Sequence, residues 1–257
     1  MVAVYTCLPL ISMVTTALAP IGSQPQGLSW PRNPHWGNFA TAWNDANLLH
    51  LLGSSLLIVL GVVPAAVLFS TLAGYGFATH RLPAGRLLFA LFLIGLAVPL
   101  ESLITPLYYQ SRTLGTFESR WAVVLPLIGI YMSFGVFWMT TQFRAIPREL
   151  REAARIDGAS DAQILRQVYL PLARSGVAAM GILYFLWTWN QFLLPLVLIS
   201  DPQKRNMAGA LGAFQTEYGT NIVLLCSASV LTMLPSLAVY ILLQRQFINA
   251  ILQGGMK

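Results

Sequence analysis

The chain has 257 residues, of which 56% are hydrophobic and 9% are charged, and its formal net charge at pH 7 is +6. A soluble domain usually carries about 25% charged residues, so the composition excludes an ordinary soluble protein and predicts an integral membrane protein. The sequence has no series of segments of about ten residues with alternating hydrophobicity, which a membrane β-barrel would require. The predicted fold class is therefore all-α, with membrane-spanning helices.

Six apolar stretches account for most of the sequence, and a membrane-spanning helix needs about 20 mostly apolar residues. They cover residues 2–19, 48–77, 87–109, 121–143, 176–199 and 222–243. Backbone polar groups in lipid must be satisfied within the segment, which favours helices for all six. The sequence therefore predicts one transmembrane domain over residues 1–257 with about six transmembrane helices.

The distribution of Lys and Arg predicts the orientation of these helices, because short cytoplasmic loops retain positive residues. An N-terminus in the cytoplasm places ten of them inside: Arg81, Arg86, Arg144, Arg148, Arg151, Arg155, Arg166, Arg174, Arg245 and Lys257. Five then lie outside: Arg32, Arg112, Arg120, Lys204 and Arg205. Both termini are predicted to be cytoplasmic. The same bias explains the net charge without a nucleic-acid partner.

The second stretch carries Ser70, Gly74 and Ala78 at four-residue spacing. Small residues at this spacing let two transmembrane helices approach closely, so this face is predicted to pack against another helix.

Glu101 is the acidic residue that lies well inside an apolar stretch, the third. An intramembrane carboxylate is a functional candidate by default. A structural or gate-packing role is favoured over direct contact with a transported solute. Pro99 and Pro106 bracket Glu101 and predict a locally broken helix.

Residues 152–171 form a charged segment between two apolar stretches, and they carry their own helix signals. Pro147 suits the first position of a helix. Gly158 suits a left-handed helix end. Ser160 and Gln163 have the spacing of a capping box. The prediction is two short helices joined by a tight bend, in water at one membrane surface.

The first of these short helices has the features of a docking face. Ala153 and Ala154 give it a flat patch, and Glu152 supplies a fixed anion beside them. The alternative is an ordinary amphipathic loop that lies on the membrane surface, and the residues alone do not decide between the two.

Trp187, Trp189 and Asn190 form an aromatic and polar cluster in the fifth stretch. Aromatic faces and amide groups suit sugar rings, which have apolar faces and hydroxylated rims, so these residues are candidates for a substrate path. The favoured alternative is packing, with the tryptophans as interfacial anchors and Asn190 as an interhelical hydrogen-bonding group.

The charged segment also matches a family pattern: Glu-Ala-Ala, three residues, Gly, nine residues, an aliphatic residue, any residue, Leu-Pro. It is met by Glu152, Ala153, Ala154, Gly158, Val168, Leu170 and Pro171. This resembles the EAA loop of permease subunits of bacterial ATP-binding-cassette importers. The segments IPRELREAARIDGAS, WNQFLLPLVL and QRQFINAILQGGMK resemble the carbohydrate branch, specifically the second permease of maltose-type importers.

The resemblance implies a non-catalytic, pore-forming subunit in the bacterial cytoplasmic membrane. Two permeases would form a pore of six plus six helices, and the EAA loop at 144–175 would dock in a cleft of a cytoplasmic ATPase dimer. ATPase closure would then switch the pore between inward-facing and outward-facing states. The implied coupling residues are Glu152, Ala153, Ala154, Gly158, Leu170 and Pro171.

The resemblance also implies further contacts. The tail at 244–257 would reach the ATPase, and the loop at 20–47 would meet an extracytoplasmic solute-binding protein. The sequence has no Gly-rich phosphate loop, so ATP and Mg²⁺ are expected in the ATPase and no cofactor is expected on this chain.

Two other classes of function stay open. Within the same superfamily the solute would be another polyol or a glycerophosphate-type compound. An ion-coupled secondary transporter would need inverted repeats or several membrane carboxylates. A metal site is not expected, because the His residues have no ligands at suitable spacing and Cys7 and Cys226 lie in apolar stretches.

Overall fold

The computed structural model describes residues 2–25, 28, 30–216 and 219–255, and it confirms a predominantly helical fold. The α-helices are α1 Val2–Ala17, α2 Gly37–Asp45, α3 Leu48–Thr79, α4 Gly85–Ala97, α5 Leu100–Thr113, α6 Trp121–Arg144, α7 Arg148–Ile156, α8 Asp161–Ile164, α9 Leu170–Leu172, α10 Arg174–Trp189, α11 Leu193–Leu198 and α12 Ile222–Gly255. Shorter elements are the π-helix η1 Leu165–Tyr169, the 3-10 helices η2 Pro202–Lys204 and η3 Met207–Phe214, and the strands β1 Gln215–Thr216 and β2 Gly219–Thr220, which pair antiparallel.

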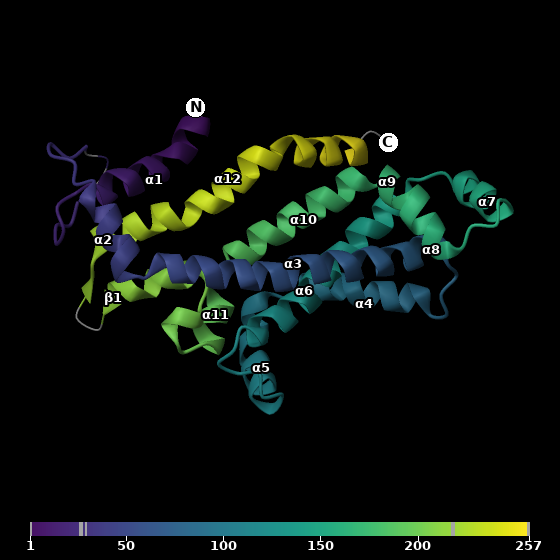
Figure 1. The fold of residues 1–257 in the computed structure, drawn as a ribbon, viewed down its shortest axis with the longest axis horizontal. Coiled ribbons are helices and arrows are strands. Elements are labelled where there is room, and N and C mark those ends of the chain that lie inside the picture. The colour runs from purple at the N-terminus through teal and green to yellow at the C-terminus, as the bar shows by residue number, and fades with distance from the viewer. Residues whose placement is uncertain (1, 26–27, 29, 217–218, 256–257) are drawn as a thin grey trace.

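Most of the long helices, α3 among them, run roughly along one long axis (Figure 1). Helix α3 packs along α6, α10 lies against α3 and α12, and α1 lies against α12. Helices α7 and α8 lie at one extremity, which we call the α7 end. Helix α2 and strand β1 lie at the opposite extremity, which we call the hairpin end. In a protein whose helices cross a membrane several times, the connecting segments lie at the two extremities, as α2 and α7 do here.

Three described helices are long and apolar enough to cross a membrane: α3, α6 and the Ile222–Gln244 part of α12. These confirm the stretches at 48–77, 121–143 and 222–243. The number of described spans rises to five if each of two strongly bent helix pairs is one span, and Tyr5–Ala17 is a shorter apolar helix.

The stretch at 87–109 is not one continuous helix, in keeping with the predicted local break. Helices α4 and α5 meet at 103°. Val98 is extended with ψ 117°, and Pro99 has no amide hydrogen with which to continue the helix. The predicted local break therefore occurs at Pro99, whereas Pro106 lies inside α5. Helix α5 turns away from the long axis (Figure 1).

The stretch at 176–199 is also interrupted. Helix α10 ends at Trp189, and α11 begins only at Leu193. The Leu186 carbonyl near the end of α10 accepts both the side-chain amide of Asn190 at 2.8 Å and the Asn190 backbone N–H at 3.1 Å. The predicted tail at 244–257 begins inside α12, which continues to Gly255; residues 256–257 and the side chains from 245 onward lie outside what the structure describes.

Close packing of α3 on α6 confirms the small-residue face. A Cβ added at Gly74 would lie 2.6 Å from Met139 Cβ, and one at Gly135 would lie 2.2 Å from Ser70 Oγ. The buried Tyr184 hydroxyl donates to the Tyr131 carbonyl at 2.7 Å and lies 3.1 Å from Ser70 Oγ. Helices α3, α6 and α10 therefore form the centre of the fold.

Candidate coupling loop and membrane pocket

The segment between α6 and α10 has the predicted helix-bend-helix form. Helix α7 begins after Pro147, and Gly158 adopts a φ of 80° beyond its C-terminal end. Ser160 caps α8 in a capping box with Gln163, as the spacing predicts. The 9-residue α7 is thus held on one side of a sharp bend, at the extremity of the molecule.

The outward face of α7 differs from the prediction in one respect. Glu152 and Ala153 are exposed, but Ala154 is half-buried and packs against the larger hydrophobic cluster of the core. The two alanines therefore do not form one patch, because neighbouring residues on a helix point about 100° apart. Leu150 and Ile156 are the exposed large apolar residues of α7, at 44% and 87% exposure.

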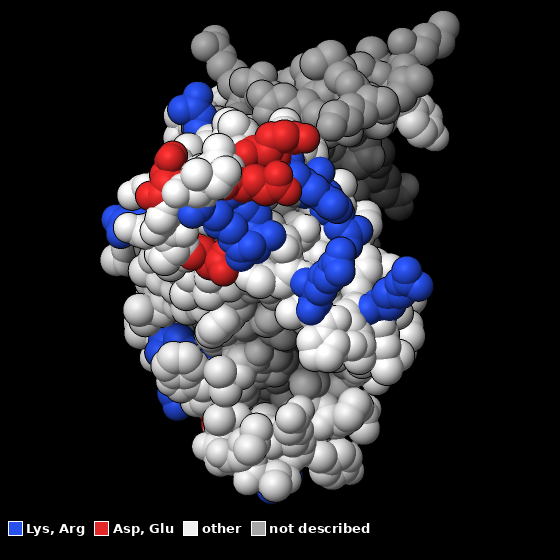
Figure 2. Space-filling view, turned by 90° about the vertical axis from the view of Figure 1, so that its right-hand side faces the viewer, with Lys and Arg blue, Asp and Glu red and all other residues white. Residues whose placement is uncertain are grey.

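These two residues went unnoticed in the sequence. Their spacing could have revealed them, because apolar residues recur every three positions, at 150, 153 and 156, among charged residues. Figure 2 shows the α7 end, where acidic and basic side chains gather around an uncharged surface. The outward face of α7 can therefore offer a partner both apolar area and charge.

The helical segment after the bend is anchored in the core. Ile164, Leu165 and Tyr169 are buried. The Tyr169 ring packs edge-on against Tyr75 of α3 and Phe143 of α6, with centroids 5.1 and 5.6 Å apart. Residues 165–169 form a π-helix, a rare form that occurs frequently at functional sites. Movement of α7 would therefore reach α3 and α6 through Tyr169.

Two other residues of the predicted motif, Leu170 and Pro171, lie where the loop meets the core. Leu170 is half-buried and packs against the same cluster. Pro171 lies in α9, just before the chain bends by 80° into α10. Both residues lie where the loop joins α10, and neither belongs to the outward face of α7.

Asp161 links the loop to the end of α3. Its carboxylate lies 3.3 Å from His80 Nε2 and accepts hydrogen bonds from Arg155 at 3.2 Å and Arg151 at 3.4 Å. Arg151 also donates to the Thr79 carbonyl. Burial alone would raise the pKa of Asp161, but the hydrogen bonds from His80, Arg155 and Arg151 outweigh it and lower the pKa below its ordinary value. The sequence analysis missed this carboxylate because its partners lie far apart along the chain.

The predicted substrate-path residues separate into two groups. Trp187 and Asn190 line an open pocket of about 470 Å³ with Tyr131 and Phe134 of α6. The Trp187 ring lies 5.2 Å from that of Phe134 and 5.5 Å from that of Tyr131. The pocket also reaches the break between α4 and α5. It combines aromatic faces with an amide, as the sequence analysis expected of a sugar-binding surface.

Trp189 and Glu101 do not line this pocket. Trp189 is buried, stacks on Phe185 and donates its indole hydrogen to the Thr232 carbonyl at 3.0 Å, which fits the packing interpretation. Glu101 is exposed in the first turn of α5, where the helix N-terminus favours negative charge. Among the described residues no group of three or more His, Cys, Asp or Glu is placed to hold a metal ion.

Comparison with known proteins gives a consistent result. Residues 66–252 match the family described as the binding-protein-dependent transport system inner membrane component. A diacetylchitobiose uptake system permease of Streptomyces coelicolor is 32% identical over 97% of this chain and 85% of its own length. An arabinooligosaccharides transport system permease of Halalkalibacterium halodurans is 34% identical over 86% of this chain and 78% of its own length.

A solved structure shares the fold. The crystal structure of a bacterial ABC transporter involved in the import of the acidic polysaccharide alginate contains a chain with a TM-score of 0.79 and 20% identity, over 96% of this chain and 92% of that one. The family match covers the centre of the fold, the loop between α6 and α10 and the pocket lined by Trp187. This chain belongs to the family of binding-protein-dependent transport system inner membrane components.

Proposed function

We propose that this chain forms one half of the pore of an ATP-driven importer for a sugar or oligosaccharide. As a permease of this family it is the non-catalytic membrane subunit, and a partner ATPase hydrolyses ATP. The carbohydrate substrate is supported by the relatives named for diacetylchitobiose, arabinooligosaccharides and lactose. It is also supported by the pocket between α6 and α10, where Trp187 and Asn190 offer an aromatic face and an amide.

One observation supports the coupling mechanism: the outer side of α7 is exposed, while the segment that follows it, with Ile164 and Tyr169, is buried in the core. In this proposal the outward face of α7, with Leu150, Glu152, Ala153 and Ile156, docks on the ATPase. Closure of the ATPase dimer pulls α7, and Tyr169 transmits the movement to α3 and α6. A solvated helix alone would move without moving the pore.

The complete assembly follows from the same proposal. A second permease supplies the other half of the pore, and the ATPase dimer binds ATP and Mg²⁺, so this chain holds no cofactor. The loop at 20–47 at the hairpin end faces the solute-binding protein. Both termini and the α7 end are cytoplasmic, and the 244–257 tail also contacts the ATPase.

Affinity purification in mild detergent tests the docking face. Ile156→Asp places a charge on the exposed apolar surface of α7, and Leu114→Asp is the matched control on an exposed leucine after α5. We expect the tagged wild type and Leu114→Asp to retain the ATPase and the second permease. Ile156→Asp should retain the second permease and lose the ATPase. Full ATPase retention by Ile156→Asp would overturn the docking assignment.

Uptake by reconstituted vesicles tests the substrate class. Vesicles with the whole importer, the solute-binding protein and internal ATP should accumulate labelled oligosaccharide, and omission of ATP should abolish uptake. Trp187→Ala should reduce uptake, whereas Trp121→Ala, on an exposed tryptophan at the start of α6 that does not line this pocket, should not. Uptake that persists without ATP would favour the secondary transporter.

A further inference from the structure

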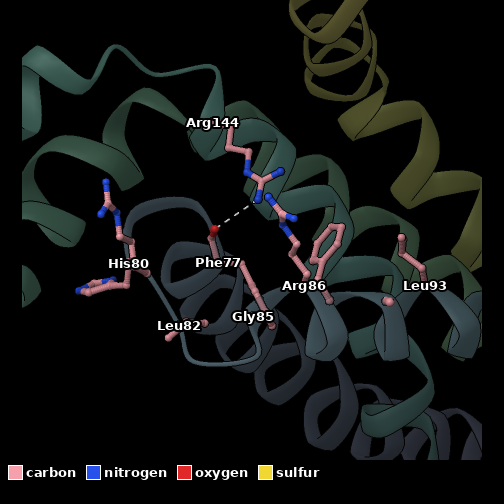
Figure 3. A pocket seen from close by; sticks show the side chains of 10 residues that line it. Phe77, His80, Leu82, Gly85, Arg86, Leu93 and Arg144 are labelled. Atoms are coloured by element: carbon pink, nitrogen blue, oxygen red, sulfur yellow. Dashed lines mark hydrogen bonds between the residues drawn. The ribbon is translucent and has the colours of Figure 1, made fainter.

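A second hollow lies beside the α7 end, and the proposed function does not use it. It has a volume of about 580 Å³ and is bounded by the end of α3, the turn at 80–85, α4 and the end of α6. Figure 3 shows the guanidinium groups of Arg86 and Arg144 pointing into the same space from α4 and α6. Arg81 also lines the hollow. Two guanidinium groups therefore face the same space, and a third arginine contributes to the lining of the hollow.

These cations have no acidic partner among the described residues. The ion pairs at this end all use Asp161, and they involve His80, Arg151 and Arg155. Arg144 is held in place by a hydrogen bond of 3.4 Å to the Phe77 carbonyl and by the Phe89 ring, whose centroid is 5.7 Å from its Cζ. Like charges that converge without a counter-charge repel each other, so the hollow favours an anion.

The floor of the hollow is apolar. Phe77 and Phe89 pack edge-on with centroids 5.5 Å apart, and Leu82, Ala90 and Leu93 complete the surface. The apolar surface continues along α4, where Leu87, Leu91 and Ile94 are 64%, 55% and 61% exposed. A bound molecule would therefore meet positive charge at the end of α4 and apolar surface along the helix.

The turn that leads into α4 gives the hollow its shape. Ala84 adopts a left-handed conformation with φ 53°, which costs an alanine energy, and the Gly85 amide donates to the Leu82 carbonyl at 3.0 Å. This tight turn brings Arg86 back toward the end of α6 after the chain has passed Arg81. Because this turn has a defined, hydrogen-bonded conformation, it fixes the position of Arg86 at the start of α4.

We propose that this hollow binds the headgroup of an anionic glycerophospholipid, with the acyl chains along the apolar face of α4. Basic pockets between transmembrane helices suit such headgroups. The phosphate lies between Arg86 and Arg144, whose planar guanidinium groups match phosphate oxygens, and Arg81 adds positive charge to the lining of the hollow. The site needs only that α3 and α6 span the membrane, so it does not depend on which solute the pore carries.

The apolar continuation along α4 selects a lipid over a free phosphate, which would use the arginines alone. It also selects a lipid over the ATPase, because the exposed coupling face lies on α7. The hollow shares Phe77, His80, Arg81 and Arg144 with a neighbouring pocket that Arg148, Arg151 and Glu152 also line. A bound headgroup would therefore neutralise positive charge next to α7.

Native mass spectrometry of the purified full chain, with the subunits that remain bound to it, tests the site. Phosphatidylglycerol and phosphatidylcholine with the same acyl chains are added in equal amounts, and the ratio of bound lipids is measured. We expect wild type to prefer phosphatidylglycerol. The double variant Arg81→Gln/Arg86→Gln should lower the preference by roughly fivefold for each guanidinium removed, or about 25-fold in total.

Two further variants control for charge and for folding. Arg86→Lys keeps the positive charge and should keep most of the preference. Arg32→Gln/Arg112→Gln removes two charges that do not line the hollow and should leave the ratio unchanged. Arg144 is left intact because its hydrogen bond to Phe77 is part of the packing. Thermal unfolding and gel filtration confirm that each variant is folded.

Three outcomes would overturn the proposal. An unchanged lipid ratio in Arg81→Gln/Arg86→Gln would show that the arginines bind no headgroup. Displacement of phosphatidylglycerol by an equal concentration of inorganic phosphate would show a site for free phosphate. Loss of the ATPase from this variant with an unchanged lipid ratio would show a protein contact. Ile156→Asp should keep the lipid preference, so the failure of the coupling proposal stays distinguishable.

Discussion

At the hairpin end, surface segments are joined to the helices by buried hydrogen bonds, whereas at the α7 end they are joined by exposed ion pairs and an aromatic cluster. At the hairpin end, Ser54 Oγ donates to the Lys204 carbonyl and accepts from Arg120 Nε, both at 2.8 Å, and Ser54 is 1% exposed. The Ser55 hydroxyl accepts from the Met207 amide at 2.7 Å. At the α7 end, the side chain of the central Asp161 is 44% exposed.

The two kinds of contact differ in what they resist. A buried polar group that loses its partner costs about 1–3 kcal/mol. An exposed ion pair contributes about 0–1 kcal/mol. The hairpin end should therefore keep its geometry during transport, while the ion pairs at the α7 end can rearrange at little cost. The buried aromatic cluster around Tyr169 links the α7 end to α3 and α6 by packing that does not depend on these ion pairs.

Tyr169→Ala should have the largest effect on this comparison. It removes a ring that is 2% exposed and contacts Tyr75 and Phe143. Loss of a buried aromatic side chain costs about 3–5 kcal/mol, so the free energy of unfolding in a detergent titration should fall by that amount. Tyr169→Phe keeps the ring and should retain most of the stability. A similar loss in both variants would contradict the packing role of the ring.

Asn38→Ala tests the hairpin end. The buried Asn38 amide donates to the carbonyls of Ala17 and Ala19, both at 2.8 Å, and so joins α2 to the end of α1. We expect the free energy of unfolding to fall by about 1–3 kcal/mol, because these carbonyls lose their donor. Asn44→Ala, on the exposed side of α2, is the control and should cost much less. Equal losses would show that the hairpin end is not fixed by this hydrogen bonding.

Local signals in the sequence predicted much of this architecture. Gly158 and the capping box of Ser160 act within a few residues, so their spacing was sufficient to predict the bend after α7. The small-residue face of α3 was predicted for the same reason. Pro99 correctly marked a break, but hydropathy averaged over 87–109 concealed that the break turns α5 by 103°.

The rest depends on contacts between residues far apart along the chain. His80 and Asp161 are separated by 81 positions, and neither looks unusual in its own segment. Trp187 and Trp189 lie two positions apart in one helix, yet one lines a pocket and the other packs against α12. The difference arises from the helices that pack around α10. The local sequence alone therefore could not show which tryptophan lines the pocket and which one packs in the core.

Gly158→Ala probes the bend itself and should have a smaller effect. A Cβ at this position meets no atom within 4 Å, but the φ of 80° is unfavourable for alanine. We expect a loss of about 1 kcal/mol, concentrated in faster amide hydrogen exchange across the bend between α7 and α8. Gly53→Ala, in the open interior of α3, should instead be neutral or slightly stabilising. Unchanged exchange at the bend would mean that its geometry does not rely on Gly158.

Asp161→Asn should have the smallest effect on stability and the most local one. It removes the negative charge that pairs with His80, Arg151 and Arg155 but keeps the size of the side chain. We therefore expect the free energy of unfolding to fall by less than about 1 kcal/mol, because these pairs are exposed. Amide exchange in α7 should rise, while exchange in α3 and α6 stays unchanged. Leu114→Asn, outside the loop, should alter neither. Increased exchange in α6 would show that the ion pairs support the pore directly.

Acidification provides an independent check on the same carboxylate. Because the pKa of Asp161 is lowered by folding, its contribution to stability is complete above the ordinary value of 3.8 and is lost as the pH falls below that value through the lowered pKa. Wild type should therefore acquire the fast α7 exchange of Asp161→Asn only in that acidic range, after correction for the intrinsic pH dependence of exchange. The variant should show no further change there. If both proteins respond alike, other carboxylates hold α7, and the contrast between the two ends does not depend on Asp161.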